Sequence, residues 1–208
     1  MSGVVRNPFK TIIVTGVPGV GKTTVLNKLK EEASRRGIKI LILNFGDYML
    51  KTAVEKSLVE NRDQLRRLPH RKQLELQRDA ARSIIRDALK ELGDTGVLIV
   101  DTHSVVKTTA GYWPGLPEHV IKELNPDSIV LIEAEPNEII ERQLADKTRY
   151  RKDILEGGEE AIREMLLMAR TAAMASATLT ASSVFIARNP QGRIEEAVES
   201  ILSLIEKV

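Results

Sequence analysis

The fold is decided by Gly16-Val17-Pro18-Gly19-Val20-Gly21-Lys22-Thr23, which matches the phosphate-binding loop pattern GxxxxGK[ST]. This loop follows a short apolar run, Thr11–Thr15, and it precedes a helical pattern that begins at Thr24. Glycines let the backbone come closer to a triphosphate than any Cβ would allow, and they turn the amide N–H groups toward it. The sequence therefore predicts a nucleoside triphosphate site in a strand, loop and helix unit.

Each polar residue of the loop has an expected role in holding the triphosphate. We expect Lys22 to reach the β- and γ-phosphates and the Thr23 hydroxyl to hold Mg²⁺, while the following helix adds its positive N-terminal end. The alternative is a glycine-rich turn with an unrelated lysine.

Five short β-rich runs without a helical period alternate with helical stretches. The expected strands are Thr11–Thr15, Ile38–Asn44, Val97–Asp101, Ser128–Glu133 and Ser183–Ala187. The expected helices cover residues 21–36, 47–57, 71–92, 115–124, 137–145, 159–180 and 191–207. This alternation predicts an α/β protein of the P-loop NTPase type, with three layers and a five-stranded parallel sheet. The length of 208 residues fits one domain, 1–208, with insertions at about 45–70 and 146–153.

Composition excludes several classes of protein. The 31 basic and 29 acidic residues give a net charge of only +2, so the chain has no general attraction for nucleic acid. It contains no cysteine, which excludes disulfides and a cysteine-ligated zinc. No apolar run approaches the length of a membrane span, and residues 1–10 lack the apolar core of a signal peptide. We therefore expect a soluble, cytoplasmic protein that does not bind membranes.

Asp101 ends the apolar run Val97–Asp101 and is the candidate for organising Mg²⁺. Ligands of open parallel sheets collect at the carboxyl ends of the strands, where a carboxylate orients the water molecules on the metal. The alternative is an Asp that only starts a turn. The next residues, Thr102 and His103, are candidates for binding a second substrate, although His103 could equally hydrogen-bond the loop.

Two arginine clusters fit phosphoryl transfer, which depends on neutralising the charge of the moving group. Arg142 and the stretch with Arg149 and Arg151 could form a short cover that excludes water, and the alternative is a solvated charged turn. Arg62 and Arg66 could hold the phosphate of an acceptor nucleotide.

Asn44 and Phe45 stand at the end of the second expected strand. They could shape the acceptor pocket, with the Phe45 ring against a base. A helix start with a core phenylalanine explains the same residues equally well.

Several motifs follow one another along nearly the whole chain: Gly16–Thr24, Asn44–Gly46, Asn61–Arg66, Asp101–Ser104, Gly111–Pro117, Glu123–Asp127 and the stretch with Arg149 and Arg151. In these motifs the chain resembles archaeal-type adenylate kinases. The resemblance implies Mg²⁺-dependent transfer of the γ-phosphoryl group from ATP to AMP, giving two ADP, and it implies a homotrimer.

The resemblance also implies individual roles. ATP would lie on the loop and Lys22, with Asn189 beside its adenine, although a helix N-cap explains Asn189 equally well. AMP would lie near Arg62, Arg66 and the turn at Asp101–Ser104. Arg142, Arg149 and Arg151 would cover the phosphates.

Three other functions compete with adenylate kinase activity. A kinase of another nucleoside monophosphate or of a nucleoside would share the loop and differ in the acceptor pocket. A GTPase is disfavoured because no N-K-x-D tetrapeptide follows the loop. An ATP-driven switch without transfer would lose ATP slowly and independently of any acceptor.

Overall fold

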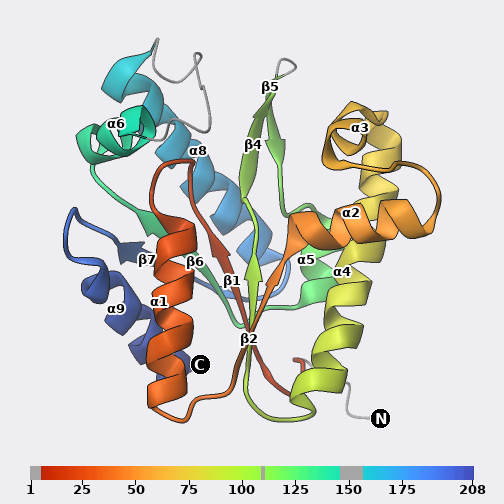
Figure 1. Cartoon of the computed structure of the whole chain (residues 1–208), viewed down its shortest axis with the longest axis horizontal. Helices are drawn as coiled ribbons and strands as arrows, with labels where there is room; N and C mark the ends of the chain where they lie inside the picture. The colour runs from red at the N-terminus through yellow and green to blue at the C-terminus, as the bar shows by residue number, and fades with distance from the viewer. Residues whose placement is uncertain (1–5, 109–110, 146–156) are drawn as a thin grey trace.

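The computed structural model describes residues 6–108, 111–145 and 157–208. Its centre is a five-stranded parallel sheet with the order β2-β3-β1-β6-β7 (Figure 1). The strands are β2 Ile40–Asn44, β3 Val97–Asp101, β1 Lys10–Thr15, β6 Ser128–Glu133 and β7 Ser183–Arg188. All five predicted strands are therefore confirmed, with ends that move by at most two residues.

The seven predicted helices are present, and a short eighth one is added among the described residues. They are α1 Lys22–Arg35, α2 Phe45–Glu55, α3 Arg62–Arg67, α4 His70–Leu92, α5 Glu118–Leu124, α6 Pro136–Ala145, α8 Gly158–Thr178 and α9 Ile194–Lys207. The expected start of α5 at Gly115 is wrong by three residues. Gly115 instead donates its amide to Ser104 O (2.8 Å), and its Cα lies too close to His103 O for any Cβ.

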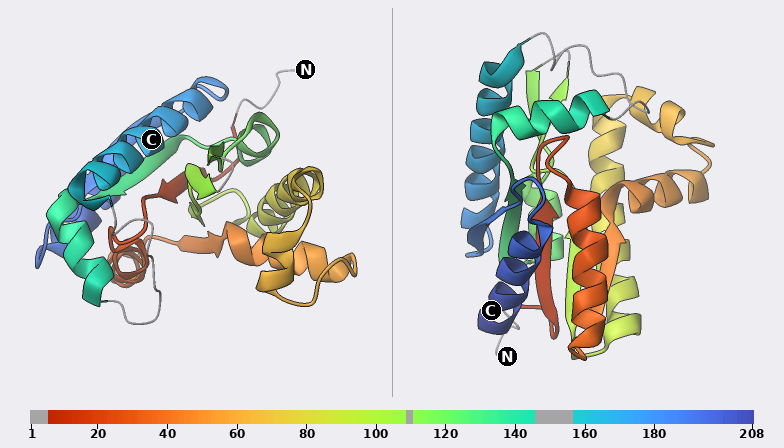
Figure 2. Two further views of the ribbon diagram at one scale, coloured as in Figure 1. Left: turned by 90° about the horizontal axis from the view of Figure 1, so that it is seen from above. Right: turned by 60° about the vertical axis from the view of Figure 1, so that its left-hand side comes forward.

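Helices cover both faces of the sheet, as Figure 2 shows from above. Helices α1 and α9 pack together on one face, while α4, α5 and α8 follow one another on the opposite face. This arrangement results from right-handed crossovers between parallel strands. Because both faces are covered, the central strands β1, β3 and β6 are almost entirely buried apolar runs.

Strand register aligns the residues that matter for function. Val14 of β1 and Asn44 of β2 are both Cα partners of Asp101 in β3. The loop that follows β1 therefore begins beside the ends of β2 and β3. All these strand ends open at the same edge of the sheet.

An antiparallel hairpin at this edge was not predicted. Its strands are β4 Val105–Thr108 and β5 Gly111–Pro114, and it stands between α8 and the α3–α4 region (Figure 1). Four-residue strands carry too few alternations to be recognised as a pattern.

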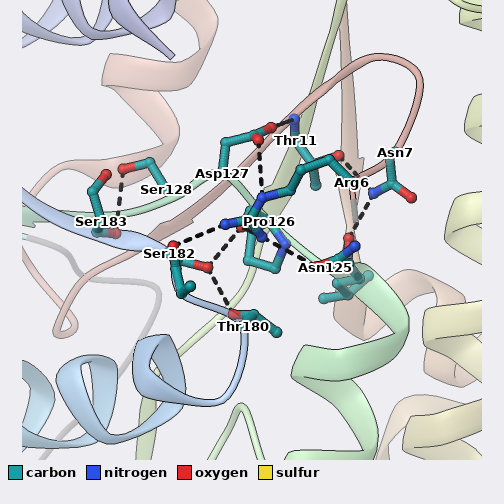
Figure 3. A network of polar contacts seen from close by, with 12 residues as sticks. Arg6, Asn7, Thr11, Asn125, Pro126, Asp127, Ser128, Thr180, Ser182 and Ser183 are labelled. Carbon is teal, nitrogen blue, oxygen red and sulfur yellow. Dashed lines mark hydrogen bonds and ion pairs between the residues drawn. The ribbon is translucent and has the colours of Figure 1, made fainter. Parts of the chain in front are cut away.

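Polar contacts join the segments at the amino-terminal ends of the strands, as Figure 3 shows. Asp127 accepts a bond from the Thr11 amide (2.8 Å), and its carbonyl accepts one from the Ser183 amide (3.0 Å). Arg6 donates to the carbonyls of Pro126 (2.6 Å) and Ala181 (2.8 Å). The amino ends of β1, β6 and β7 are thus tied together, which leaves the carboxyl edge for a ligand.

No helix in the described part of the chain is both long and apolar enough to cross a membrane.

Candidate active site

The loop from Gly16 to Lys22 lies between β1 and α1 in a conformation that requires glycine. Gly19 and Gly21 have φ angles of +96° and +84°, a region that residues with a Cβ rarely adopt. A Cβ at Gly21 would lie 2.7 Å from Asn189 Nδ2, and one at Gly16 would lie 2.8 Å from Ile132 O. The loop is therefore packed closely against the ends of β6 and β7.

Lys22 points toward the end of β3. Its ammonium group donates to Asp101 Oδ1 and to the carbonyl of Thr102 (2.8 Å). Burial lowers the pKa of Lys22 below its ordinary value, and the charge of Asp101 partly offsets this effect. The two charged residues predicted to act on the phosphates and on Mg²⁺ are thus brought together.

Asp101 is held from a second side by Asn44. The Asn44 amide donates to Asp101 Oδ2 (2.7 Å), and its carbonyl oxygen accepts the backbone N–H of Asp47 (3.1 Å). Asn44 is therefore also the N-cap of α2. The Asp47 carboxylate pairs with Arg62 at the start of α3. A continuous chain of polar contacts runs from Lys22 to Arg62.

The predicted acceptor residues lie in more open surroundings. The side chains of Arg62 and Asp47 are 50% and 64% exposed, and Arg66 lies in the same short helix, α3. Phe45, in contrast, is 5% exposed and packs in the main core. This burial favours the core interpretation of Phe45 over stacking on a base.

The turn after β3 is fixed by the neighbouring strand. The Thr102 amide donates to Val14 O (3.1 Å), and the Ser104 amide donates to Thr15 Oγ1 (2.7 Å). His103 Nδ1 lies 3.4 Å from Gly16 O, which fits the alternative in which His103 contacts the loop. Thr102 and His103 thus lie beside the loop and Lys22.

Arg142 and Asn189 clamp the loop from the other side. Arg142 donates to the carbonyls of Val20 (3.1 Å) and Asn189 (2.9 Å), and Asn189 Nδ2 donates to Val20 O (2.8 Å). Both residues border a pocket of 290 Å³. Its lining consists of Gly21, Thr24, Arg142, Asn189, Pro190, Gln191, Gly192, Ile194 and Glu195. Arg149 and Arg151, the other predicted cover residues, lie outside the described residues.

Known proteins with similar sequences include kinases that act on nucleotides by name. A family model described as an AAA domain matches residues 15–163. An adenylate kinase from Sulfurisphaera tokodaii is 49% identical over 195 residues, which cover 94% of this chain and 98% of that protein. One from Methanocaldococcus jannaschii is 46% identical over 197 residues, with 95% and 98% covered. The chain belongs to the adenylate kinase family.

The resemblance drawn from the motifs is therefore confirmed, and so is the phosphotransferase class. A solved shikimate kinase from Bacteroides thetaiotaomicron has a TM-score of 0.51 at 14% identity, with 95% of this chain and 98% of that chain covered. At this identity the likeness concerns the fold alone, and it confirms the three-layer P-loop architecture.

Two sets of contacts at this site were missed from the sequence. Gln143 is 9% exposed and donates to Pro18 O (2.6 Å), which adds a further clamp on the loop. Glu133 ends β6, and its buried carboxylate forms an ion pair with the partly exposed Arg170 of α8. The rule that selected Asp101, a carboxylate at the end of a buried strand beside β1, applies equally to Glu133 and would have found it.

Proposed function

We propose that the chain catalyses the reversible transfer of the γ-phosphoryl group of ATP to AMP, giving two ADP, with Mg²⁺ as the cofactor. The observation that carries the proposal is the polar connection from Lys22 through Asp101 and Asn44 to the Asp47–Arg62 pair. This connection links the triphosphate loop to Arg62, whose guanidinium group is suited to bind a second phosphate. Transfer between two nucleotides requires both sites. The relatives named adenylate kinase support the same reaction.

On the donor side, the loop amides and Lys22 bind the β- and γ-phosphates. Lys22 exchanges its contact with Asp101 for the phosphate oxygens, where its charge opposes the negative charge that accumulates during transfer. The low exposure of its surroundings strengthens this interaction, since screening by water is reduced.

Thr23 and Asp101 are the residues that would hold Mg²⁺. Hydroxyl and carboxylate oxygens suit this hard cation, and Thr23 stands next to Lys22 at the exposed start of α1. When bound, the ion would neutralise charge on the β- and γ-phosphates. Asp101, which Asn44 already holds in place, would then orient the metal's water ligands.

On the acceptor side, Arg62 exchanges Asp47 for the phosphate of AMP, and Arg66 contributes a second guanidinium. Arginine binds phosphate through two parallel hydrogen bonds, which fixes the direction of the acceptor oxygen as well as its distance. Asn44, Thr102 and His103 line the same end of the sheet and are proposed to border the bound AMP, while Phe45 supports α2 from the core.

The adenine of ATP is assigned to the 290 Å³ pocket beside Asn189, and Arg142 is assigned to the phosphates at the mouth of that pocket. In the ligand-free protein, Arg142 binds the carbonyls of Val20 and Asn189, so it lies within one side-chain rearrangement of the loop. The roles of Arg149 and Arg151 remain predictions.

We further propose a homotrimer in the cytoplasm. Leu167 and Met174 are seven residues apart on α8 and are 61% and 56% exposed, so they form an apolar strip on one face of that helix. Sedimentation velocity is expected to give a trimer for the parent protein and smaller species for Met174→Glu. A monomeric parent protein would contradict this part of the proposal.

The activity is tested with a panel of acceptors in the presence of Mg·ATP. AMP, CMP, UMP, GMP, adenosine and water are compared, and ADP formation is followed. We expect two ADP for each AMP consumed and little turnover with the other acceptors. Faster turnover with another acceptor, or ATP loss that does not depend on an acceptor, would contradict adenylate kinase activity.

A further inference from the structure

Glu133 is a buried carboxylate that the proposed reaction does not use. It is 1% exposed, although it stands at the carboxyl end of β6, directly beside the strand that leads into the phosphate loop. Both of its oxygens accept bonds from Arg170, with Nε–Oε1 and Nη2–Oε2 distances of 2.7 and 2.5 Å. The Arg170 side chain is 43% exposed, so only one partner of this bidentate pair is fully removed from water.

Glu133 stands where three parts of the donor site meet. Its backbone carbonyl accepts the amide of Asn189 (2.7 Å), and Asn189 in turn holds Val20 of the loop. The preceding residue, Ile132, places its carbonyl so close to Gly16 that no Cβ fits there. A displacement of Glu133 would therefore move the groups that contact both Gly16 and Val20 of the phosphate loop.

Arg170 is fixed to the same region through its own helix. The carbonyl of its neighbour Ala169 accepts a bond from Ser104 Oγ (3.1 Å), and the Ser104 amide binds Thr15 at the end of β1. Helix α8 packs directly against β6 (Figure 1). The ion pair thus joins α8 to the strand ends that support the loop.

Stability alone is a weak reason for such a pair. Removing the Glu133 carboxylate from water offsets much of its attraction to Arg170, and apolar residues of similar volume often replace a buried pair without loss of stability. A bidentate pair differs from apolar packing in that it fixes direction as well as distance.

We propose that the Glu133–Arg170 pair is a positioning element for the donor nucleotide: it sets the distance between β6 and α8 and thereby the shape of the loop that binds the phosphates of ATP. The proposal rests on the assignment of ATP to this loop. It gives Glu133 and Arg170 a large effect on ATP and a small one on AMP, since Arg62 and Arg66, which are assigned to the phosphate of AMP, belong to α3.

The test compares the affinity for a non-hydrolysable ATP analogue with Mg²⁺, measured by calorimetry without AMP, and the KM values for ATP and AMP. Arg170→Met removes the pair, Arg170→Lys keeps the charge without the fork, and Glu133→Met/Arg170→Met replaces the pair by apolar contact. The matched control is Arg82→Met, which removes the Arg82–Glu123 pair between α4 and α5 (Nε–Oε1 2.7 Å).

We expect Arg170→Met to weaken binding of the analogue and to raise the KM for ATP by about tenfold, because small displacements of positioned groups have large effects. The KM for AMP changes by less than about twofold, Arg170→Lys is intermediate, and Arg82→Met behaves as the parent protein. The double Met variant regains thermal stability and still binds the analogue weakly.

Three results would overturn the proposal: unchanged analogue binding in Arg170→Met and Arg170→Lys, an equal loss in Arg82→Met, or recovery of both stability and affinity in the double Met variant. The calorimetry contains no acceptor, so it tests this proposal independently of the assignment of AMP as the acceptor. The acceptor panel tests that assignment separately.

Discussion

The donor loop and the acceptor arm of this protein are built in opposite ways. In the donor loop, the carbonyls of Pro18 and Val20 accept bonds from Gln143, Arg142 and Asn189. The acceptor arm, α2 with α3, is joined to the main core through Phe45, and elsewhere it packs on α4 through a small cluster formed by Ala53, Val59 and Leu76 with partly buried neighbours. Arg62, which we propose binds the acceptor phosphate, is half exposed and is paired with the Asp47 carboxylate, which is more exposed still.

The difference follows from what each region binds. Backbone N–H groups surround a triphosphate only if the loop already has the right shape, and contacts from α6 and from Asn189 after β7 stabilise that shape. An acceptor has to enter and leave, and regions with few buried contacts open at low cost in free energy. The donor side is therefore preformed, and we expect the acceptor arm to adjust on binding.

The largest effect is expected for Lys22→Ala. Removing the ammonium group takes away charge neutralisation in the transition state, so kcat/KM falls by roughly a hundredfold to a thousandfold, or about 3–4 kcal/mol. Steady-state kinetics and thermal unfolding measure this effect. Lys28→Ala, on the same helix but in surface contact with Glu31 and Glu32, serves as the control and keeps normal turnover. Near-normal transfer by Lys22→Ala would remove Lys22 from the mechanism.

The next effect concerns the metal. Asp101→Asn keeps the shape of the strand end but loses the negative charge, so we expect a lower rate and a higher Mg²⁺ requirement, by about tenfold or more. A titration of the rate with Mg²⁺ measures both, with Asp94→Asn, at the exposed turn after α4, as the control. If the Mg²⁺ optimum and the rate stayed the same, Asp101 would have only a structural role.

Gly21→Ala tests whether the donor loop is preformed. The new Cβ combines a strained φ of +84° with a contact 2.7 Å from Asn189, so we expect a loss of about 1–3 kcal/mol in stability together with weaker ATP binding. Gly37→Ala has a similar φ of +70° and no atom within 4 Å of the added Cβ, so it isolates the backbone strain. Equal ATP affinity in the two variants would mean that the close packing at Gly21 does not matter.

Arg62→Ala should produce a smaller and more selective change. Loss of one charge-assisted contact to the acceptor phosphate is expected to raise the KM for AMP by about tenfold, while the KM for ATP changes little. Arg71→Ala, on the exposed start of α4, is the control. A fall in kcat without any change in the KM for AMP would mean that Arg62 does not bind the phosphate of AMP.

The donor loop was predictable because one contiguous stretch carries both the phosphate contacts and the glycines that the backbone requires. Asp101 was predictable for a related reason, since it ends a buried strand beside that stretch. Gln143 and Arg170 act through contacts between segments far apart in the sequence, which no local pattern reports, whereas the rule that selected Asp101 would also have found Glu133. Short elements, α3 and the β4–β5 hairpin, have too few residues for a period to be visible.

The contrast between a preformed donor loop and an adjustable acceptor arm is tested most directly by amide hydrogen exchange in the ligand-free protein. Two equivalent amides are compared: Val25 donates to Gly21 O in the first turn of α1, and Leu65 donates to Asn61 O in α3, both at 3.1 Å. We predict that the Leu65 amide exchanges at least about a hundredfold faster, and that AMP slows Leu65 without changing Val25. Equal protection of the two amides before any ligand is added would contradict the account.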